Sequence, residues 1–71
     1  MPGQPVISVD ARGLRCPWPA LRLARAVREA GPGATIELVA DDPAAVAEVT
    51  ALAAERGWRL EANPPHFVVR A

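Results

Sequence analysis

The chain has 71 residues and a formal net charge of zero. This length predicts one domain, residues 1–71, with no room for a large internal substrate cavity. The 51% of hydrophobic and 23% of charged residues are typical of a globular protein and exclude a disordered one. The balanced charge also argues against direct nucleic-acid binding, which usually needs a basic excess.

The first predicted element is a strand over residues 6–10, because apolar residues occupy every second position there. A helix follows over residues 17–30, since Pro17 and Pro19 are tolerated in a first turn. Gly31-Pro32-Gly33 ends this helix. The next alternating segment, residues 35–40, predicts a second strand.

The second half of the chain predicts a helix over residues 43–56, with Asp42 as its N-cap and Gly57 after its last turn. Two further strands are predicted over residues 58–62 and 66–70, joined by a hairpin at residues 63–65. The apolar residues predicted to pack against the sheet are Ala20, Leu21, Leu23, Ala24 and Val27 in the first helix and Val46, Val49, Leu52 and Ala53 in the second.

The predicted fold is α/β, with the order β-α-β-α-β-β. The strands are apolar on one side only, so both helices are expected on one face of a mixed four-stranded sheet, in a two-layer α/β sandwich. The first crossovers should join parallel strands, adjacent or with one strand skipped.

The chain contains a single cysteine, Cys16. One thiol excludes an internal disulfide, a CxxC redox pair and a Cys-rich zinc site, and we expect neither metal nor cofactor. Residues 1–5 are predicted to be a loose lead-in that lacks the features of a signal peptide, and no apolar run is long enough to cross a membrane. A free thiol without an export signal points to the cytoplasm.

Cys16 is predicted to occupy the N-cap of the first helix, where the helix dipole and nearby Arg12 and Arg15 would stabilise a reactive thiolate. Gly13 permits a tight or left-handed turn before it, and Pro17 and Pro19 stiffen the corner behind it. Carboxylates expected at the same sheet edge, from Asp10, Asp41 and Asp42, would act in the opposite direction and raise the thiol pKa. The sequence leaves the direction of the shift open. The alternative for Cys16 is a buried residue that serves only in packing.

Arginines recur every third residue on the first helix, at Arg22, Arg25 and Arg28. They form either a solvated face or a docking surface for an acidic partner. Trp18, beside the thiol, is a candidate interface residue, because Trp is frequent in binding hot spots. Trp58 is predicted to pack at the core or sheet edge, and His66 to face solvent on the side of the sheet away from the helices.

The sequence around the thiol resembles the TusA family of small sulfur carriers, also called the SirA-like family. Its signature is a Cys-Pro-x-Pro motif at the start of the first helix, after a strand ending in Asp and a Gly-Leu-x turn. In this chain the stretch reads Val9-Asp10-Ala11-Arg12-Gly13-Leu14-Arg15-Cys16-Pro17-Trp18-Pro19. Later segments agree as well, and the resemblance covers nearly the whole chain: Pro32-Gly33, Ala40-Asp41-Asp42-Pro43 and Gly57-Trp58.

The resemblance implies that Cys16 accepts sulfane sulfur as a persulfide from a cysteine desulfurase or rhodanese-like donor and passes it to an acceptor protein. Known uses in the family are tRNA thiolation, molybdenum cofactor synthesis and dissimilatory sulfur oxidation. The chain departs from the family at Trp18, where smaller or acidic residues are common. It departs again at Glu48-Val49-Thr50, where many members carry Asp-Ile-Pro.

Two rival functions follow from the residues themselves. One is a non-catalytic interaction or regulatory module in which Cys16 only completes the helix cap. The other is a thiol redox sensor, which is disfavoured because such sensors usually place a resolving cysteine nearby and this chain has none.

Overall fold

The structure, a computed structural model, describes residues 6–71, so the lead-in predicted for residues 1–5 lies outside the described residues. Six elements follow in the predicted order. They are β1 (Val6–Asp10), α1 (Trp18–Ala30), β2 (Thr35–Val39), α2 (Ala45–Arg56), β3 (Arg59–Asn63) and β4 (His66–Arg70). No helix among these residues is long and apolar enough to cross a membrane.

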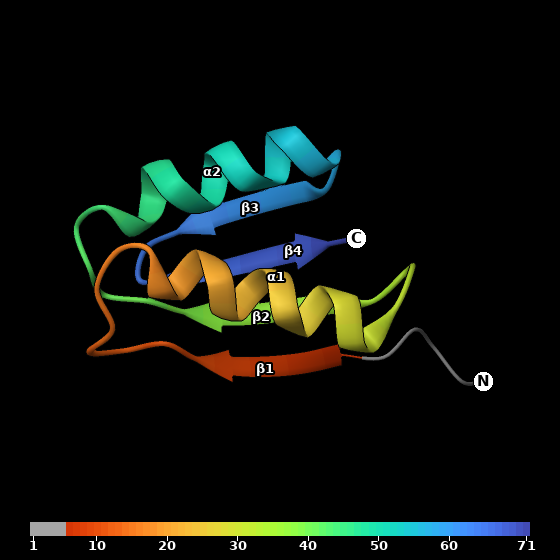
Figure 1. The fold of residues 1–71 in the computed structure, drawn as a ribbon, viewed down its shortest axis with the longest axis horizontal. Helices are drawn as coiled ribbons and strands as arrows, with labels where there is room; N and C mark the ends of the chain where they lie inside the picture. The colour runs from red at the N-terminus through yellow and green to blue at the C-terminus, as the bar shows by residue number, and fades with distance from the viewer. Residues whose placement is uncertain (1–5) are drawn as a thin grey trace.

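The four strands form one mixed sheet in the order β1-β2-β4-β3. β1 pairs with β2 in parallel, while β4 pairs antiparallel with both β2 and β3. The crossover through α2 therefore skips one strand, and residues 63–66 close the predicted hairpin between β3 and β4. Figure 1 shows both helices on the same side of the sheet, which confirms the two-layer α/β sandwich.

The core lies between this face of the sheet and the two helices. Ile36, Leu38, Phe67 and Val69 are buried from the sheet, and their neighbours on the opposite face, such as Glu37, are exposed or half-buried. From the helices, Leu23 and Val49 are fully buried. Burial of each large side chain contributes about 1.5–3 kcal/mol, so these few residues hold the helices on the sheet.

Two apolar side chains predicted to pack inward are instead exposed. Leu21 in α1 keeps 50% of its surface accessible and Val46 in α2 keeps 41%. Both lie in the first turns of their helices, at the end where the chain enters from the sheet. Small residues fill the core at this end instead, among them Ala11, Ala40 and Ala45.

Both helices begin later than predicted. The N-cap of α1 is Pro17, and that of α2 is Ala44. Before α1, the Trp18 N–H bonds the Arg15 carbonyl at 2.8 Å, which makes Cys16 and Pro17 the middle of a tight turn. Before α2, the Ala45 N–H bonds the Asp42 carbonyl at 2.9 Å, so a turn there also precedes the helix. The prediction that Cys16 and Asp42 are N-caps was therefore wrong.

Candidate functional site

The candidate site is the corner between β1 and α1, which holds Cys16 at the end of the sheet where β1 and β2 both finish. Cys16 is exposed, so the alternative of a buried packing residue does not hold. Its peptide bond to Pro17 is cis. Pro19 is buried and anchors the first turn of α1, whereas Pro17 is exposed beside the thiol.

The neighbouring loop between β2 and α2 fastens this corner through carboxylates. The Cys16 N–H donates to Asp42 Oδ2 at 3.3 Å, and the Gly13 N–H donates to Asp41 Oδ1 at 2.9 Å. Gly13 has a φ of 80°, the left-handed conformation expected from the sequence. Asp42 also accepts the Ala44 N–H at 3.3 Å, so one side chain ties the two loops together.

The thiol itself contacts Glu48, in the first turn of α2. Cys16 Sγ donates a hydrogen bond to Glu48 Oε2, and the other carboxylate oxygen, Oε1, is buried without a hydrogen-bond partner in the described residues. This hydrogen bond, partial burial and the negative charges of Glu48 and Asp42 raise the pKa of the Cys16 thiol. The direction that the sequence left open is thus upward.

The arginines expected to lower the thiol pKa do not set its environment. Arg12 turns back to Asp10, with Nε and Nη2 both 2.9 Å from its carboxylate oxygens. This ion pair lowers the pKa of the Asp10 carboxyl to about 2. Arg15 is exposed. The helix dipole also acts less directly than expected, because Cys16 lies one residue before the N-cap.

Sequence reasoning did not place Glu48 beside the thiol. It is separated from Cys16 by 32 residues. A signal was nevertheless present: in parallel βαβ units the first turns of the helices share one edge of the sheet, and Glu48 is the acidic residue in the first turn of α2. The same topology placed Asp41 and Asp42 at this edge, and Glu48 lies one helical turn beyond them.

The predicted partner residues are all on the surface of α1. Trp18 is 56% exposed in the first turn, close in sequence to the thiol, and Arg22, Arg25 and Arg28 are exposed. Trp58 is half-buried and packs against the core, with the Arg56 guanidinium 5.8 Å from its ring centre. His66 is exposed on the sheet face opposite the helices, as predicted. No group of three or more His, Cys, Asp or Glu within residues 6–71 could hold a metal ion.

The thiol lies on the surface of the protein. It stands at a corner that hydrogen bonds join to the neighbouring loop, and it donates a hydrogen bond to a carboxylate. No other thiol exists in the chain to form a disulfide with it.

Comparison with known proteins identifies a family. Residues 7–70 match the protein family described as "Sulfurtransferase TusA". A protein of Archaeoglobus fulgidus named "Putative sulfur carrier protein" is 42% identical over 52 residues, which cover 73% of this chain and 68% of that protein.

Proposed function

Because the chain belongs to the TusA sulfurtransferase family, we propose that it is a sulfur carrier that holds sulfane sulfur as a persulfide on Cys16. The observation that carries the proposal is the exposure of the only thiol in the chain at a turn fixed by hydrogen bonds to a neighbouring loop. A relay needs such a thiol and no second one, since a resolving thiol would discharge the persulfide as a disulfide.

The transfer step needs no outside oxidant. The Cys16 thiolate attacks the outer sulfur of a donor persulfide, a bond forms between the two sulfurs, and the donor's own S–S bond breaks. The donor leaves as a thiolate, which takes up the proton that Cys16 gave up. Passing the sulfur to an acceptor thiolate repeats the same exchange in the other direction.

Glu48 controls when Cys16 becomes a nucleophile. In the free carrier its carboxylate accepts the thiol hydrogen bond and, together with Asp42, disfavours the thiolate. A donor that draws Glu48 away or neutralises it on docking would release the thiolate where the sulfur is delivered. This arrangement protects the exposed thiol from unrelated electrophiles between transfers.

The supporting residues around the thiol are Arg12, Gly13, Arg15, Pro17 and Pro19. They shape the turn that presents Cys16, through the left-handed Gly13 and the buried Pro19. Trp18 and the arginines Arg22, Arg25 and Arg28 are proposed to contact partner proteins. The exposed Leu21 and Val46 lie in first turns at the same end of the sheet as the thiol and offer apolar surface for docking.

The partners implied are a cysteine desulfurase or rhodanese-like donor and a downstream acceptor protein. Thiolation of tRNA, molybdenum cofactor synthesis and other sulfur-trafficking pathways all use such a relay, and we propose that the chain acts in one of them in the cytoplasm. We do not expect the chain itself to bind nucleic acid, because its formal net charge is zero.

Intact-mass spectrometry tests the proposal. The wild-type protein is incubated without reductant with a cysteine desulfurase and cysteine, and separately with a rhodanese and thiosulfate. We expect one added sulfur, about 32 Da, that is removed by reductant and absent in Cys16→Ser. Equal loading of Cys16→Ser, or no loading from either donor, contradicts the proposal.

One observation favours a second candidate, a non-catalytic interaction module. The raised pKa of the Cys16 thiol makes it less reactive than an ordinary exposed cysteine. This candidate predicts that Cys16→Ser binds its partner as well as the wild type does and that neither protein takes up sulfur.

A further inference from the structure

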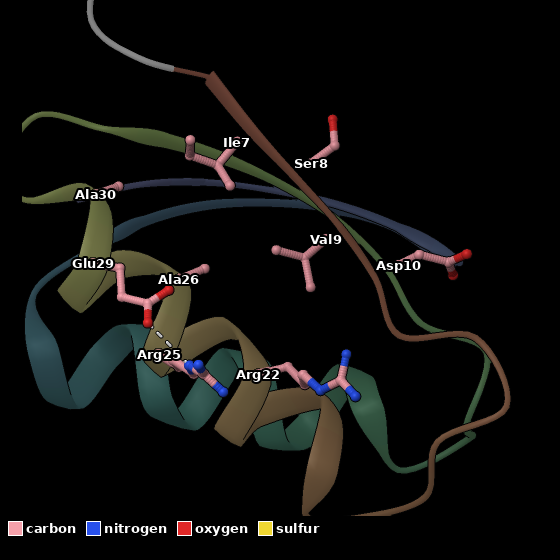
Figure 2. Close-up of a pocket in the computed structure, with 9 residues that line it drawn as sticks. All are labelled: Ile7, Ser8, Val9, Asp10, Arg22, Arg25, Ala26, Glu29 and Ala30. Carbon is pink, nitrogen blue, oxygen red and sulfur yellow. Dashed lines mark hydrogen bonds and ion pairs between the residues drawn. The ribbon is translucent and has the colours of Figure 1, made fainter.

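A surface groove of about 590 Å³ runs between the outer edge of β1 and helix α1. Figure 2 shows Ile7 and Val9 pointing from β1 toward the helix, with Arg22, Arg25 and Glu29 projecting from α1 along the other wall. The groove therefore has an apolar floor and a charged rim. The Arg22 end lies toward Asp10, the end of β1 from which the chain continues to Cys16.

In the sheet that residues 6–71 form, β1 is an edge strand, so its outer backbone groups make no hydrogen bonds to another of these strands. The Ala11 N–H bonds the Val39 carbonyl of β2 at 2.8 Å. In a parallel pair, alternate residues direct both N–H and C=O to the same neighbour, so Ile7, Val9 and Ala11 face β2. The N–H and C=O groups of Ser8 and Asp10 then point away from β2, at the free edge of the sheet that borders the groove.

The strand at the opposite edge of the sheet, β3, carries charged side chains. It carries Arg59 and Glu61, and Glu61 is 3.8 Å from Arg70 of β4. Charged side chains along an edge strand discourage pairing with another chain. β1 has no charged residue before Asp10, and its side chains at positions 6–9 are aliphatic or serine. β1 is therefore the edge available for pairing.

The charge on the groove rim is positive at one end. Arg25 is paired with Glu29 at 3.0 Å, and Asp10 is neutralised by Arg12 at 2.9 Å. Within residues 6–71, Arg22 makes no ion pair. An uncompensated guanidinium thus stands beside the open backbone edge, at the end of the groove near Cys16.

We infer that β1 accepts an extended segment of a partner protein as a fifth strand of the sheet, in a β-augmentation. The segment carries an acidic side chain that faces Arg22 and apolar side chains that cover Ile7 and Val9. A second copy that paired through its own β1 fits less well, because the one acidic residue of that strand, Asp10, is already paired with Arg12. Pairing to β1 would align the partner along α1 and deliver its acidic end toward Cys16.

Peptide titration followed by two-dimensional ¹⁵N NMR of the full chain tests the inference. The probes are the acetylated and amidated pentapeptides Val-Thr-Val-Thr-Glu, for parallel pairing, and Glu-Thr-Val-Thr-Val, for antiparallel pairing. We expect one of them to shift signals of β1 and α1 and to slow hydrogen exchange of the Ser8 amide. Replacing Glu by Lys should weaken binding about threefold or more.

Three variants separate backbone pairing from charge. Ser8→Pro removes an outward N–H without touching the bonds to β2, so it should abolish binding, while Ser8→Ala should bind like the wild type. Arg22→Glu should weaken binding about threefold to tenfold. It keeps the inference testable even if Ser8→Pro does not fold.

Wild-type affinity in a folded Ser8→Pro, shifts at β3 instead of β1, or an unchanged affinity in Arg22→Glu would overturn the inference. So would self-association through β1 in the absence of peptide, which would make a second copy the occupant. The titration involves no sulfur transfer, so its outcome is independent of whether Cys16 carries a persulfide.

Discussion

The two loops that lead from the sheet into the helices differ in what they contribute to the same corner. The loop between β1 and α1, residues 11–17, presents a thiol and backbone N–H groups. The loop between β2 and α2, residues 40–44, presents carboxylates that accept those N–H groups, and Glu48 follows it one turn later. The conformation of the corner and the protonation of its thiol are thus set by residues 26 to 32 positions away.

The difference between the two loops explains why an exposed cysteine can have a raised thiol pKa. The arginines next to Cys16 in the sequence would by themselves lower the thiol pKa, and the carboxylates expected nearby would raise it, so the sequence left the direction of the shift open. The fold turns Arg12 to Asp10 and brings Glu48 to the sulfur. Electrostatics at the site follow distance in space, and the closest charge in space comes from the second loop and helix.

The largest expected effect is on stability, from removing the buried side chain that packs beneath the second loop. Phe67 is almost fully buried and lies under the segment that contains Asp41 and Asp42. Phe67→Ala should lower the free energy of unfolding by about 3–5 kcal/mol. Urea denaturation checks this, with Val68→Ala on the half-buried opposite face as the control. A loss no larger than that of the control would contradict the packing described for Phe67.

Removing the carboxylate that contacts the sulfur should have the next largest effect. Glu48→Gln keeps the shape of the side chain and removes the charge that disfavours the thiolate, so the pKa of the Cys16 thiol should fall. The rate of alkylation by iodoacetamide near pH 7.5 should rise severalfold, and its pH profile should move to lower pH.

The matched control for this change is Glu55→Gln. Glu55 is exposed near the end of α2, where it pairs with Arg56 at 3.5 Å. It should leave the alkylation profile in place. An unchanged or higher thiol pKa in Glu48→Gln would show that this carboxylate does not stabilise the protonated thiol.

Loosening the tie between the loops should have a smaller effect on the thiol and a measurable one on stability. Asp42→Ala removes the acceptor of the Cys16 and Ala44 N–H groups, which should cost about 1–2 kcal/mol of unfolding free energy. The thiol pKa should fall less than in Glu48→Gln, because Asp42 contributes only a more distant charge. A larger shift of the pKa than in Glu48→Gln would reverse the order of the two carboxylates.

The smallest expected effect is the pH dependence of the Asp10–Arg12 ion pair at the start of the first loop. The pKa of Asp10 is lowered from an ordinary value of 3.8 to about 2 by its bonds to Arg12. The stabilisation from this pair is therefore complete above about pH 4 and is lost as the pH falls through 2. NMR titration of the Asp10 carboxyl carbon should show a midpoint near 2, and Arg12→Ala should return it toward 3.8. A wild-type midpoint near 4 would show that the pair does not form in solution.

The sequence predicted most of the fold because its signals there are local. Alternation along residues 6–10 and 66–70 and the glycines after each helix placed the six elements to within one or two residues. The helix starts were less accurate, because proline and aspartate signal a turn as readily as a helical cap. At Asp42 both roles use the same side-chain oxygen, and only the backbone shows that the helix begins at Ala45.

The candidate site could be predicted only in part. Cys16 and the loop that carries it were evident from residues 12–19, and Asp42 was expected nearby from the topology. Glu48 reaches the thiol from a separate element, 32 residues along the chain. Arg12 lies between Asp10 and Cys16 in the sequence, and only the folded loop shows that it pairs with Asp10. These missed contacts are the ones that decide the charge at the sulfur.

The most direct test of sulfur carriage by Cys16 is to locate the transferred atom. The protein is loaded from a cysteine desulfurase supplied with ³⁴S-labelled cysteine, trapped with iodoacetamide and analysed by tandem mass spectrometry. If Cys16 carries the sulfur, the peptide that contains it holds a single labelled sulfur, attached to Sγ and lost on reduction. Label elsewhere in the chain, or a Cys16 peptide alkylated directly on its thiol with no added sulfur, would contradict sulfur carriage by Cys16.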